Sequence, residues 1–114
     1  MTFADTPEPP YVAVIFTSVR TEGDRGYAAM AVAIEELAKE QPGYLGIEAA
    51  RDDELGITVS YWADDAAAQA WKKVAAHLAA QNRGRETWYS DYQVRVATVH
   101  RAYTMLSSEL AGTR

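Results

Sequence analysis

The sequence predicts one α+β domain with the element order β-α-β-β-α-β, the ferredoxin-like arrangement of an antiparallel sheet with two helices on one face. The chain has 114 residues, the length of a single domain, and 48% of them are hydrophobic, which is enough for one small core. Two stretches show the three- and four-residue apolar spacing of amphipathic helices. Four others are rich in the β-branched and aromatic residues that favour strands.

The first strand and helix follow a proline-rich lead-in. Residues 1–10 contain three prolines among small and acidic residues, so we expect a flexible N-terminal segment. Tyr11–Val19 is predicted to be a strand, because it is rich in Val, Ile, Phe and Thr and lacks a breaker. The spacing over Tyr27–Gln41 predicts a helix with Asp24 as a candidate N-cap, and Pro42-Gly43 ends it.

The second half of the chain repeats this plan with a hairpin in front. Tyr44–Arg51 and Gly56–Trp62 are expected to be paired strands. Asp64 or Asp65 then caps a second helix that ends before the polar stretch 82–86. A long β-rich run, Trp88–Tyr103, is predicted to be the fourth strand.

These elements give the expected domain organisation. One domain spans residues 11–104, between the N-terminal segment and a C-terminal tail at 105–114, which we expect to be a short helix or disordered.

The first strand is apolar on both faces, which bears on how the sheet is covered. Val12, Val14 and Phe16 share one face, and Ala13 and Ile15 share the other. An antiparallel sheet with one solvated face should alternate apolar and polar residues, and two helices cover only one face. We therefore expect a second copy of the chain to cover the other face in a homodimer. The alternative is a small sheet with an apolar back.

Composition excludes several classes of protein and site. There is no cysteine, so disulfides, thiolate metal sites and cysteine nucleophiles are absent, and two histidines 23 positions apart predict no metal site. A net charge of -5 argues against nucleic-acid binding. The longest uncharged run has 11 residues, too short for a membrane span, and the acidic start differs from a signal peptide. A cytoplasmic protein is expected.

Residues with possible chemistry concentrate in the last third of the chain, and each has two interpretations. His77 lies on or beside the apolar face of the second helix, where it is either a core residue or a proton carrier lining a cavity. Trp71 is either core or an aromatic platform. Arg85 and Arg95 either extend along a sheet edge or hold an anion such as an enolate oxygen.

The chain resembles the antibiotic biosynthesis monooxygenase family of the dimeric α+β barrel superfamily. Nearly all of residues 11–103 take part in the resemblance. It rests on the pieces Tyr11-Val12-Ala13-Val14-Ile15-Phe16, Gln41-Pro42-Gly43-Tyr44, Ser60-Tyr61-Trp62-Ala63-Asp64-Asp65, Ala70-Trp71 and a C-terminal run that includes His77, Gln81, Arg85, Trp88, Tyr92, Arg95 and Arg101.

The resemblance implies a homodimer whose two sheets face each other, with a pocket in each subunit between sheet and helices. Characterised members include oxygenases without metal or flavin, in which a phenol or anthrone loses a proton and reacts directly with oxygen. The protein then desolvates and orients the substrate and stabilises its anion. A haem-degrading branch has a tryptophan that Trp71 matches. Its haem-ligating histidine is replaced here by Gln81, so no cofactor is expected.

The resemblance therefore implies a cofactor-independent monooxygenase that acts on a small aromatic or quinone-like substrate with molecular oxygen. His77 is the candidate for proton transfer, and Arg85 or Arg95 with Tyr92 would stabilise an oxyanion. Substrate-binding residues are predicted to be Tyr61, Trp71, Gln81, Trp88 and Arg95. On an ideal strand Tyr92 and Arg95 point to opposite faces, so one of them is expected at the dimer seam. The alternatives are a non-catalytic binding or structural module and a haem-binding enzyme.

Overall fold

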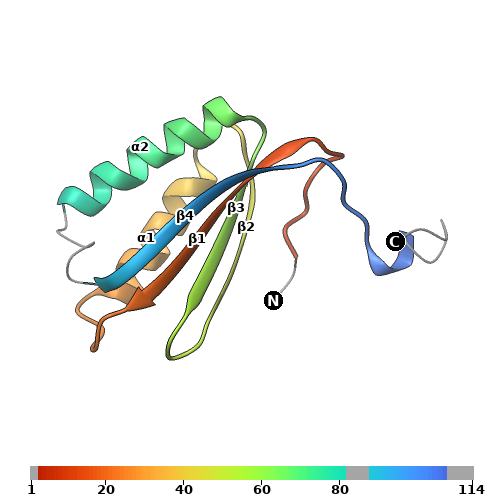
Figure 1. The fold of residues 1–114 in the computed structure, drawn as a ribbon. Helices are drawn as coiled ribbons and strands as arrows, with labels where there is room; N and C mark the ends of the chain where they lie inside the picture. The colour runs from red at the N-terminus through yellow and green to blue at the C-terminus, as the bar shows by residue number, and fades with distance from the viewer. Residues whose placement is uncertain (1–2, 82–87, 108–114) are drawn as a thin grey trace.

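The computed structural model describes residues 3–81 and 88–107 and confirms the predicted α+β fold, a four-stranded sheet with two helices (Figure 1). All three strand pairs are antiparallel, in the order β2-β3-β1-β4. The elements are β1 Tyr11–Arg20, α1 Tyr27–Lys39, β2 Tyr44–Arg51, β3 Gly56–Trp62, α2 Asp65–Gln81 and β4 Tyr89–Val99.

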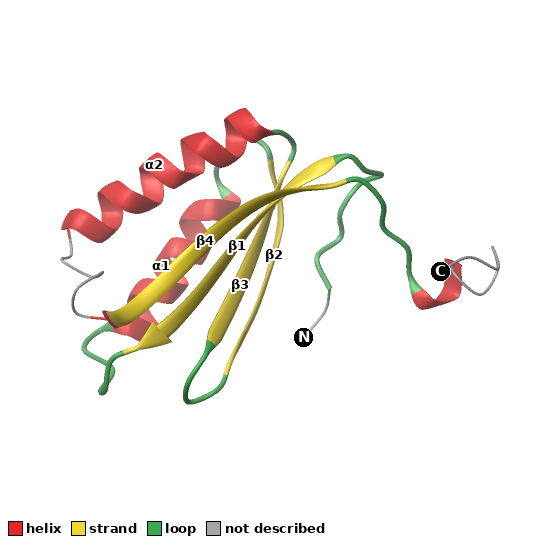
Figure 2. Ribbon diagram, in the orientation of Figure 1, coloured by secondary structure: helices red, strands yellow, loops and turns green. Residues whose placement is uncertain are grey.

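Both helices lie on the same side of the sheet, and the other side carries no helix (Figure 2). We call these sides the helix face and the open face. Val12 of β1 pairs with Trp62 of β3, and both pack with the helices, so the even-numbered residues of β1 belong to the helix face. Ala13 and Ile15 belong to the open face. The predicted division of β1 is therefore confirmed.

The core is built around two stacked tryptophans. Trp62 is completely buried, and its ring lies 5.6 Å from that of Trp71 on α2, at an interplanar angle of 23°. The indole N–H of Trp62 donates to Ser60 Oγ at 2.9 Å, so its one polar group is satisfied. Ala38 of α1 and Ala68 of α2 are also buried here, and their small side chains let the helices approach the rings.

The turn before β2 depends on a glycine. Gly43 has a φ of 83°, a conformation that side chains rarely adopt. A Cβ at this position would lie only 2.6 Å from the Cβ of Ala67 on α2. The turn and the close packing of α2 against it therefore both require the missing side chain.

Aspartate side chains stabilise the start of each helix. Gly26, with a φ of 85°, is the N-cap of α1, so the prediction of Asp24 as the N-cap is wrong by two residues. The Asp24 carboxylate still accepts hydrogen bonds from the backbone N–H of Gly26 and Ala28 and so stabilises the turn that leads into the helix. Asp64 Oδ1 accepts from the N–H of Ala67 at 2.8 Å, so Asp64 rather than Asp65 caps α2. Within the described residues, no helix is both long and apolar enough to cross a lipid bilayer.

Two predicted elements end earlier than expected. The fourth strand stops at Val99 instead of Tyr103, because Val99 pairs with Tyr11, the first residue of β1, and no strand continues beside it. The α1 helix stops at Lys39 instead of Gln41, since the next backbone N–H groups switch to carbonyls three residues back. In the predicted tail, residues 105–107 form a helical turn closed by hydrogen bonds between Thr104 and Ser107.

The N-terminal segment contacts the open face near β2 and β3. The backbone N–H of Ala4 donates to Glu48 Oε2 at 2.9 Å, and the Tyr61 hydroxyl donates to Glu48 Oε1 at 2.7 Å. A Cβ on Gly46 would lie 2.6 Å from the Cβ of Ala4, so the glycine makes room for the segment. Glu48 therefore joins the segment to the sheet, while the flexibility expected for residues 1–10 stays a prediction.

Replacement of Trp62 by Ala should lower the free energy of unfolding by about 3–5 kcal/mol, because it removes the largest fully buried side chain and leaves a cavity against Trp71. The measurement is urea unfolding followed by circular dichroism at one protein concentration. Val32→Ala on the exposed side of α1 is the matched control and should change stability by less than about 0.5 kcal/mol. A Trp62→Ala variant as stable as this control would contradict the proposed core.

Stability should fall as pH rises from about 10 to about 12, partly through Tyr61. Burial, followed by its hydrogen bond to Glu48, raises the pKa of Tyr61 from 10.0 to about 12. The neutral phenol therefore stabilises the fold below the unfolded pKa, and this contribution is lost as the folded group ionises. Denaturant unfolding at several alkaline pH values should show a shallower fall for Tyr61→Phe than for the native protein. Tyr103→Phe, at an exposed position, should leave the slope unchanged.

Candidate functional site

The candidate site is the part of the helix face over β1 and β4. α1 packs mainly against β2, and α2 packs against β3 and β1. By register, Val94 and Val96 of β4 lie beside Phe16 and Val14 on the helix face, yet 48% and 56% of their surfaces are exposed. An apolar strip of β4 thus remains available to a ligand in the described structure.

An aromatic cluster lies on this face, where β1 ends and β4 begins. The Phe16 ring is 5.3 Å from the rings of both Tyr89 and Tyr92, and Tyr27 at the start of α1 is 5.8 Å from Tyr89. Trp88 lies edge-on to Tyr27 at 6.2 Å. Edge-to-face and tilted contacts of this kind are favourable between aromatic rings. We call this set, Phe16, Tyr27, Trp88, Tyr89 and Tyr92, the aromatic cluster.

Hydrogen bonds from two side chains to backbone carbonyls fix the cluster to the start of α1. The indole N–H of Trp88 donates to the Arg25 carbonyl at 3.0 Å. Arg20 Nη1 donates to the Trp88 carbonyl at 2.6 Å, and the same guanidinium lies 3.7 Å from the centre of the Tyr27 ring. Trp88 is therefore a buried anchor whose polar groups are engaged.

Tyr89 of the cluster is in an environment that disfavours charge. Burial, and then the interaction with Tyr27, raises the pKa of Tyr89 well above its ordinary value, while Arg51 and Arg20 oppose this rise. Tyr89 therefore stays a neutral phenol near neutral pH. An electrostatic interaction with a ligand is stronger in such a poorly hydrated place than in water.

The structure brings two predicted site residues together and places two others elsewhere on the helix side. Trp88 and Tyr92 both belong to the aromatic cluster. Trp71 is buried in the core against Trp62, which matches its alternative interpretation as a core residue. His77 is exposed on α2, so it is not a buried core histidine.

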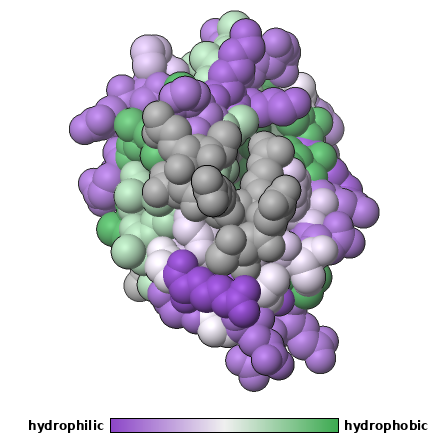
Figure 3. All heavy atoms as spheres, turned by 90° about the vertical axis from the view of Figure 1, so that its left-hand side faces the viewer, coloured by the Kyte–Doolittle hydropathy of each residue, from purple (hydrophilic) through white to green (hydrophobic). Residues whose placement is uncertain are grey.

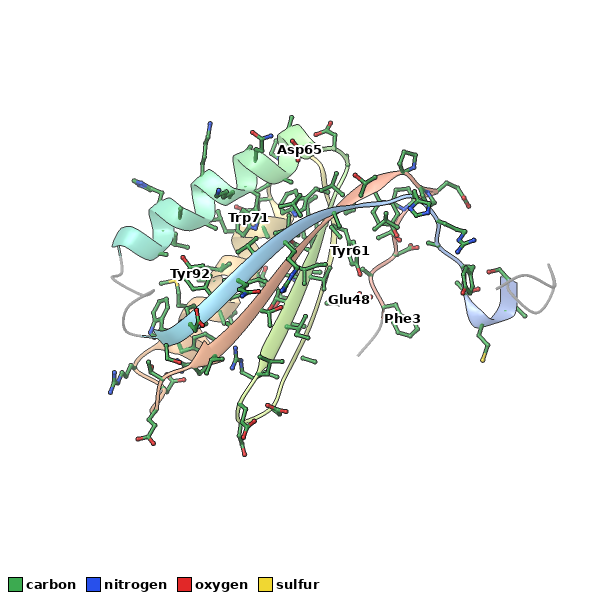
Figure 4. All side chains as sticks on the ribbon, in the orientation of Figure 1. Phe3, Glu48, Tyr61, Asp65, Trp71 and Tyr92 are labelled. Carbon is green, nitrogen blue, oxygen red and sulfur yellow. The ribbon has the colours of Figure 1, made fainter. Side chains whose placement is uncertain are left out.

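Tyr61 and Arg95 lie on the opposite side of the sheet. Tyr61 pairs with Ala13 and Arg95 pairs with Ile15, both on the open face, and Arg95 Nη2 donates to Gln93 Oε1 at 2.6 Å. Figure 4 shows Tyr61 on the other side of the sheet from Trp71. The expected opposition of Tyr92 and Arg95 is thus settled by register, with Tyr92 on the helix face opposite Ser18. The whole thickness of the sheet separates Tyr61 and Arg95 from the aromatic cluster.

Two further predicted positions are beyond what the structure describes. Arg85 and the side chain of Gln81 lie outside the described residues, so their roles stay predictions. Among the residues that the structure does describe, no three His, Asp or Glu side chains are grouped as a metal site would require.

Sequence reasoning missed Phe16 and Tyr27 as site residues and assigned no role to Tyr89. Phe16 alternates in step with Val12 and Val14, so the sequence predicts its face of the sheet. Its ring contacts, however, are with aromatic residues more than 70 positions away. The sequence places Tyr27 only on the apolar stripe of its helix.

Figure 3 views the end of the molecule where α2 ends and β4 begins. Hydrophobic residues show there on both flanks, beneath a hydrophilic top.

Comparison with known proteins places this geometry in a family. The family model of antibiotic biosynthesis monooxygenases matches residues 10–83. The Bacillus subtilis protein YqjZ, which has no assigned activity, is 52% identical over 97 residues, covering 84% of this chain and 85% of YqjZ. This coverage and identity show common descent over most of both chains.

Solved structures of low sequence identity share the fold. SnoaB from Streptomyces nogalater, described as a cofactor-independent oxygenase, superposes with a TM-score of 0.64 at 12% identity, over 85% of this chain and 98% of SnoaB. PA3566 from Pseudomonas aeruginosa gives a TM-score of 0.62 at 19% identity, over 85% and 99% of the two chains. The sequence match and the shared architecture together show that this chain belongs to the antibiotic biosynthesis monooxygenase family.

Proposed function

We propose that the protein is a cofactor-independent monooxygenase that acts on a small aromatic, quinone-like substrate. The observation that carries this proposal is the aromatic cluster beside the exposed apolar strip of Val94 and Val96. A flat aromatic molecule gains ring contacts and desolvation on such a surface. Membership of the family supports the reaction class, and SnoaB, described as a cofactor-independent oxygenase, has the same fold.

The proposed reaction needs no external reductant, because an electron-rich substrate supplies all four electrons that reduce oxygen. For 1,4-dihydroxynaphthalene, a phenol first loses a proton, and the ring carbon then bonds to oxygen to give a hydroperoxide. Loss of water breaks the O–O bond and leaves 2-hydroxy-1,4-naphthoquinone. One oxygen atom enters the product and the other leaves as water. The protein must hold the substrate, accept the proton and stabilise the phenolate.

The proposal assigns these tasks to residues on the helix side of the sheet. Tyr92 would contact the substrate ring, with the buried Trp88 anchoring the aromatic cluster behind it, and the Tyr92 hydroxyl would donate to the developing oxyanion. His77 on α2 is the proposed proton acceptor, since imidazole exchanges protons near neutral pH. Arg85 and Gln81 remain part of the proposal as residues near the end of α2. Tyr61 and Arg95 have no part in this site, because they lie on the open face.

One observation favours a second function, a binding module without catalysis. Trp71, the expected platform for a substrate, is buried against Trp62 in the core and is not available as a free ring face. The aromatic cluster would then bind a flat ligand without transforming it. Oxygen uptake separates the two functions.

The open face supports a further part of the proposal, a homodimer. Ile57 has 43% of its surface exposed there, beside the partly exposed side chains of Ile15 and Val59. Isologous pairing of two such faces would remove this apolar surface from water. Each subunit would keep its own helix-face site, because that site lies on the other side of the sheet.

Purified protein should consume oxygen in the presence of 1,4-dihydroxynaphthalene faster than buffer does, with one oxygen consumed per hydroxynaphthoquinone formed. Tyr92→Phe should reduce the enzymatic rate by about tenfold or more, since it removes an oxyanion donor while keeping the ring. His77→Ala should also reduce it by about tenfold or more, because a general base is lost. The measurements are electrode traces with product quantified by absorbance.

Tyr103→Phe, in the exposed C-terminal segment, is the control and should keep the native rate. A His77→Ala variant with full turnover would refute the proton-transfer role. Native protein that binds the hydroquinone under nitrogen but never exceeds the buffer rate in air would refute the oxygenase and support the binding module.

Ile57→Asp should convert the dimer into a monomer, because it places a charge on the apolar part of the open face that would be buried in the proposed seam. Native mass spectrometry of the purified proteins measures subunit stoichiometry directly. Val32→Asp introduces the same charge at an exposed position on α1, away from the open face, and should stay dimeric. A native protein that is monomeric, or an Ile57→Asp dimer of undiminished stability to dilution, would refute pairing through this face.

A further inference from the structure

A row of four residues crosses the whole sheet on the helix face and ends at the aromatic cluster. Arg51 of β2 pairs with Gly56 of β3, Gly56 pairs with Ser18 of β1, and Ser18 pairs with Tyr92 of β4. The side chain of Arg51 extends inward along this row. Its Nη2 donates to both the hydroxyl and the carbonyl oxygen of Ser18, two strands away. The guanidinium therefore lies across the sheet instead of extending from its edge.

Two small residues make this position possible. A Cβ on Gly56 would overlap the guanidinium and Nε of Arg51, so only glycine leaves room for the arginine to cross β3. Ser18 is buried, and both of its oxygens that accept from Arg51 belong to the interior of the sheet. The arrangement fixes a long, flexible side chain in one conformation, which normally costs side-chain entropy.

The charge that is fixed in this way is not part of a salt bridge in the described part of the chain. Arg51 forms no ion pair there, and its Nε and Nη1 have no protein acceptor among the same residues. Asp52 is the neighbouring acid. Hydrogen bonds from the backbone N–H groups of Leu55 and Glu54 to its Oδ1, and then the charge of Arg51, lower the pKa of Asp52, so the two groups interact without forming an ion pair. Arg20 differs, because its guanidinium donates hydrogen bonds to the backbone carbonyls of Trp88, Gly23 and Asp24. Arg51 is thus a cation with donors to spare, and Ser18 fixes its position on the helix face.

The charge acts on the aromatic cluster. Both Arg51 and Arg20 oppose the rise in the pKa of Tyr89 that burial causes, so their fields reach its hydroxyl. Phe16, Tyr89 and Tyr92 supply ring contacts next to Ser18, to which Arg51 is bound. Aromatic rings beside a guanidinium with spare N–H groups suit a flat ring that carries a carboxylate.

We propose that Arg51 is an anion-recognising residue of the helix-face site, and that the site takes aromatic acids, in which a carboxylate is attached to the ring bound by the aromatic cluster. This inference rests on the location of the site in the proposed function but not on catalysis. It assigns recognition of the anion to a residue of the β2–β3 hairpin, whereas sequence reasoning assigned it to Arg85 or Arg95.

The test compares two probes that differ only in the carboxylate, 1,4-dihydroxy-2-naphthoate and 1,4-dihydroxynaphthalene. Binding is measured under nitrogen by isothermal titration calorimetry, so that neither turnover nor autoxidation contributes. The native protein should bind the acid about tenfold or more tightly than the neutral probe, and added salt should reduce this preference. Equal affinity for the two probes would overturn the proposal.

Three variants locate the effect. Arg51→Met should abolish the preference for the acid and leave the neutral probe within about twofold, because it removes the charge but keeps an unbranched side chain over Gly56. Arg51→Lys should keep part of the preference, since it retains a charge without the planar fork. Arg95→Met removes an arginine from the open face of the same sheet and should behave like the native protein.

The readouts separate this inference from the proposed function. A preference for the acid that disappears in Arg51→Met supports the inference even if no oxygen is ever consumed. A preference that survives in Arg51→Met overturns it, even if the protein proves to be an oxygenase. Thermal unfolding of each variant without ligand shows whether the variant is folded. If Arg51→Met is not folded, Arg51→Lys decides the test, and its preference for the acid must then be smaller than that of the native protein.

Discussion

The alternation of side chains along β1 is the constraint on which the rest of the structure depends. β1 is hydrogen-bonded on both edges, to β3 and to β4, so its register sets the faces of its neighbours. Val12 and Val14 face the helices, whereas Ala13 and Ile15 face away. A slip of one residue would exchange the two sets and expose the core. Because both sets are apolar, the same strand supports a packed helix layer on one side and an apolar surface on the other.

Along the helix face, stability and ligand recognition use opposite ends of β1. At its first residues the face is closed by the stacked rings of Trp62 and Trp71, where buried alanines let the helices come close. Near Ser18, at the other end of β1, the rings of the aromatic cluster pack on the helix face, and the apolar strip of β4 stays exposed. A ligand bound there would add to the packing at that end without disturbing the tryptophan stack. The protein can therefore present aromatic surface at its site and still keep a close-packed core.

Most of the fold follows from local patterns, whereas the site depends on which strands meet. The order of elements, the bounds of β2 and β3 and the capping of α2 by Asp64 are visible in apolar period and turn chemistry. The end of β4 could not be predicted from its own sequence, because β4 ends where its partner β1 begins. Parity showed that Tyr92 and Arg95 point apart, but only the register with Ser18 and Ile15 tells which faces the helices. In the sequence, Arg51 is distinguished only as the last residue of a predicted strand. Its contact with Ser18, 33 positions away, requires knowing that Gly56 lies between them.

Net charge and local charge lead to different conclusions about partners. The chain carries a net charge of -5, which opposes the approach of an extended polyanion. That repulsion is screened over roughly 8–10 Å at physiological salt, so a small ligand already on the helix face responds mainly to the groups around it. There the fixed charge is positive, since the guanidinium of Arg51 is held by Ser18 and no carboxylate of the described residues pairs with it. The guanidinium of Arg51, oriented by Ser18 beside aromatic rings, therefore supports the proposal of a small aromatic anion as ligand, whereas the net charge argues against nucleic acid.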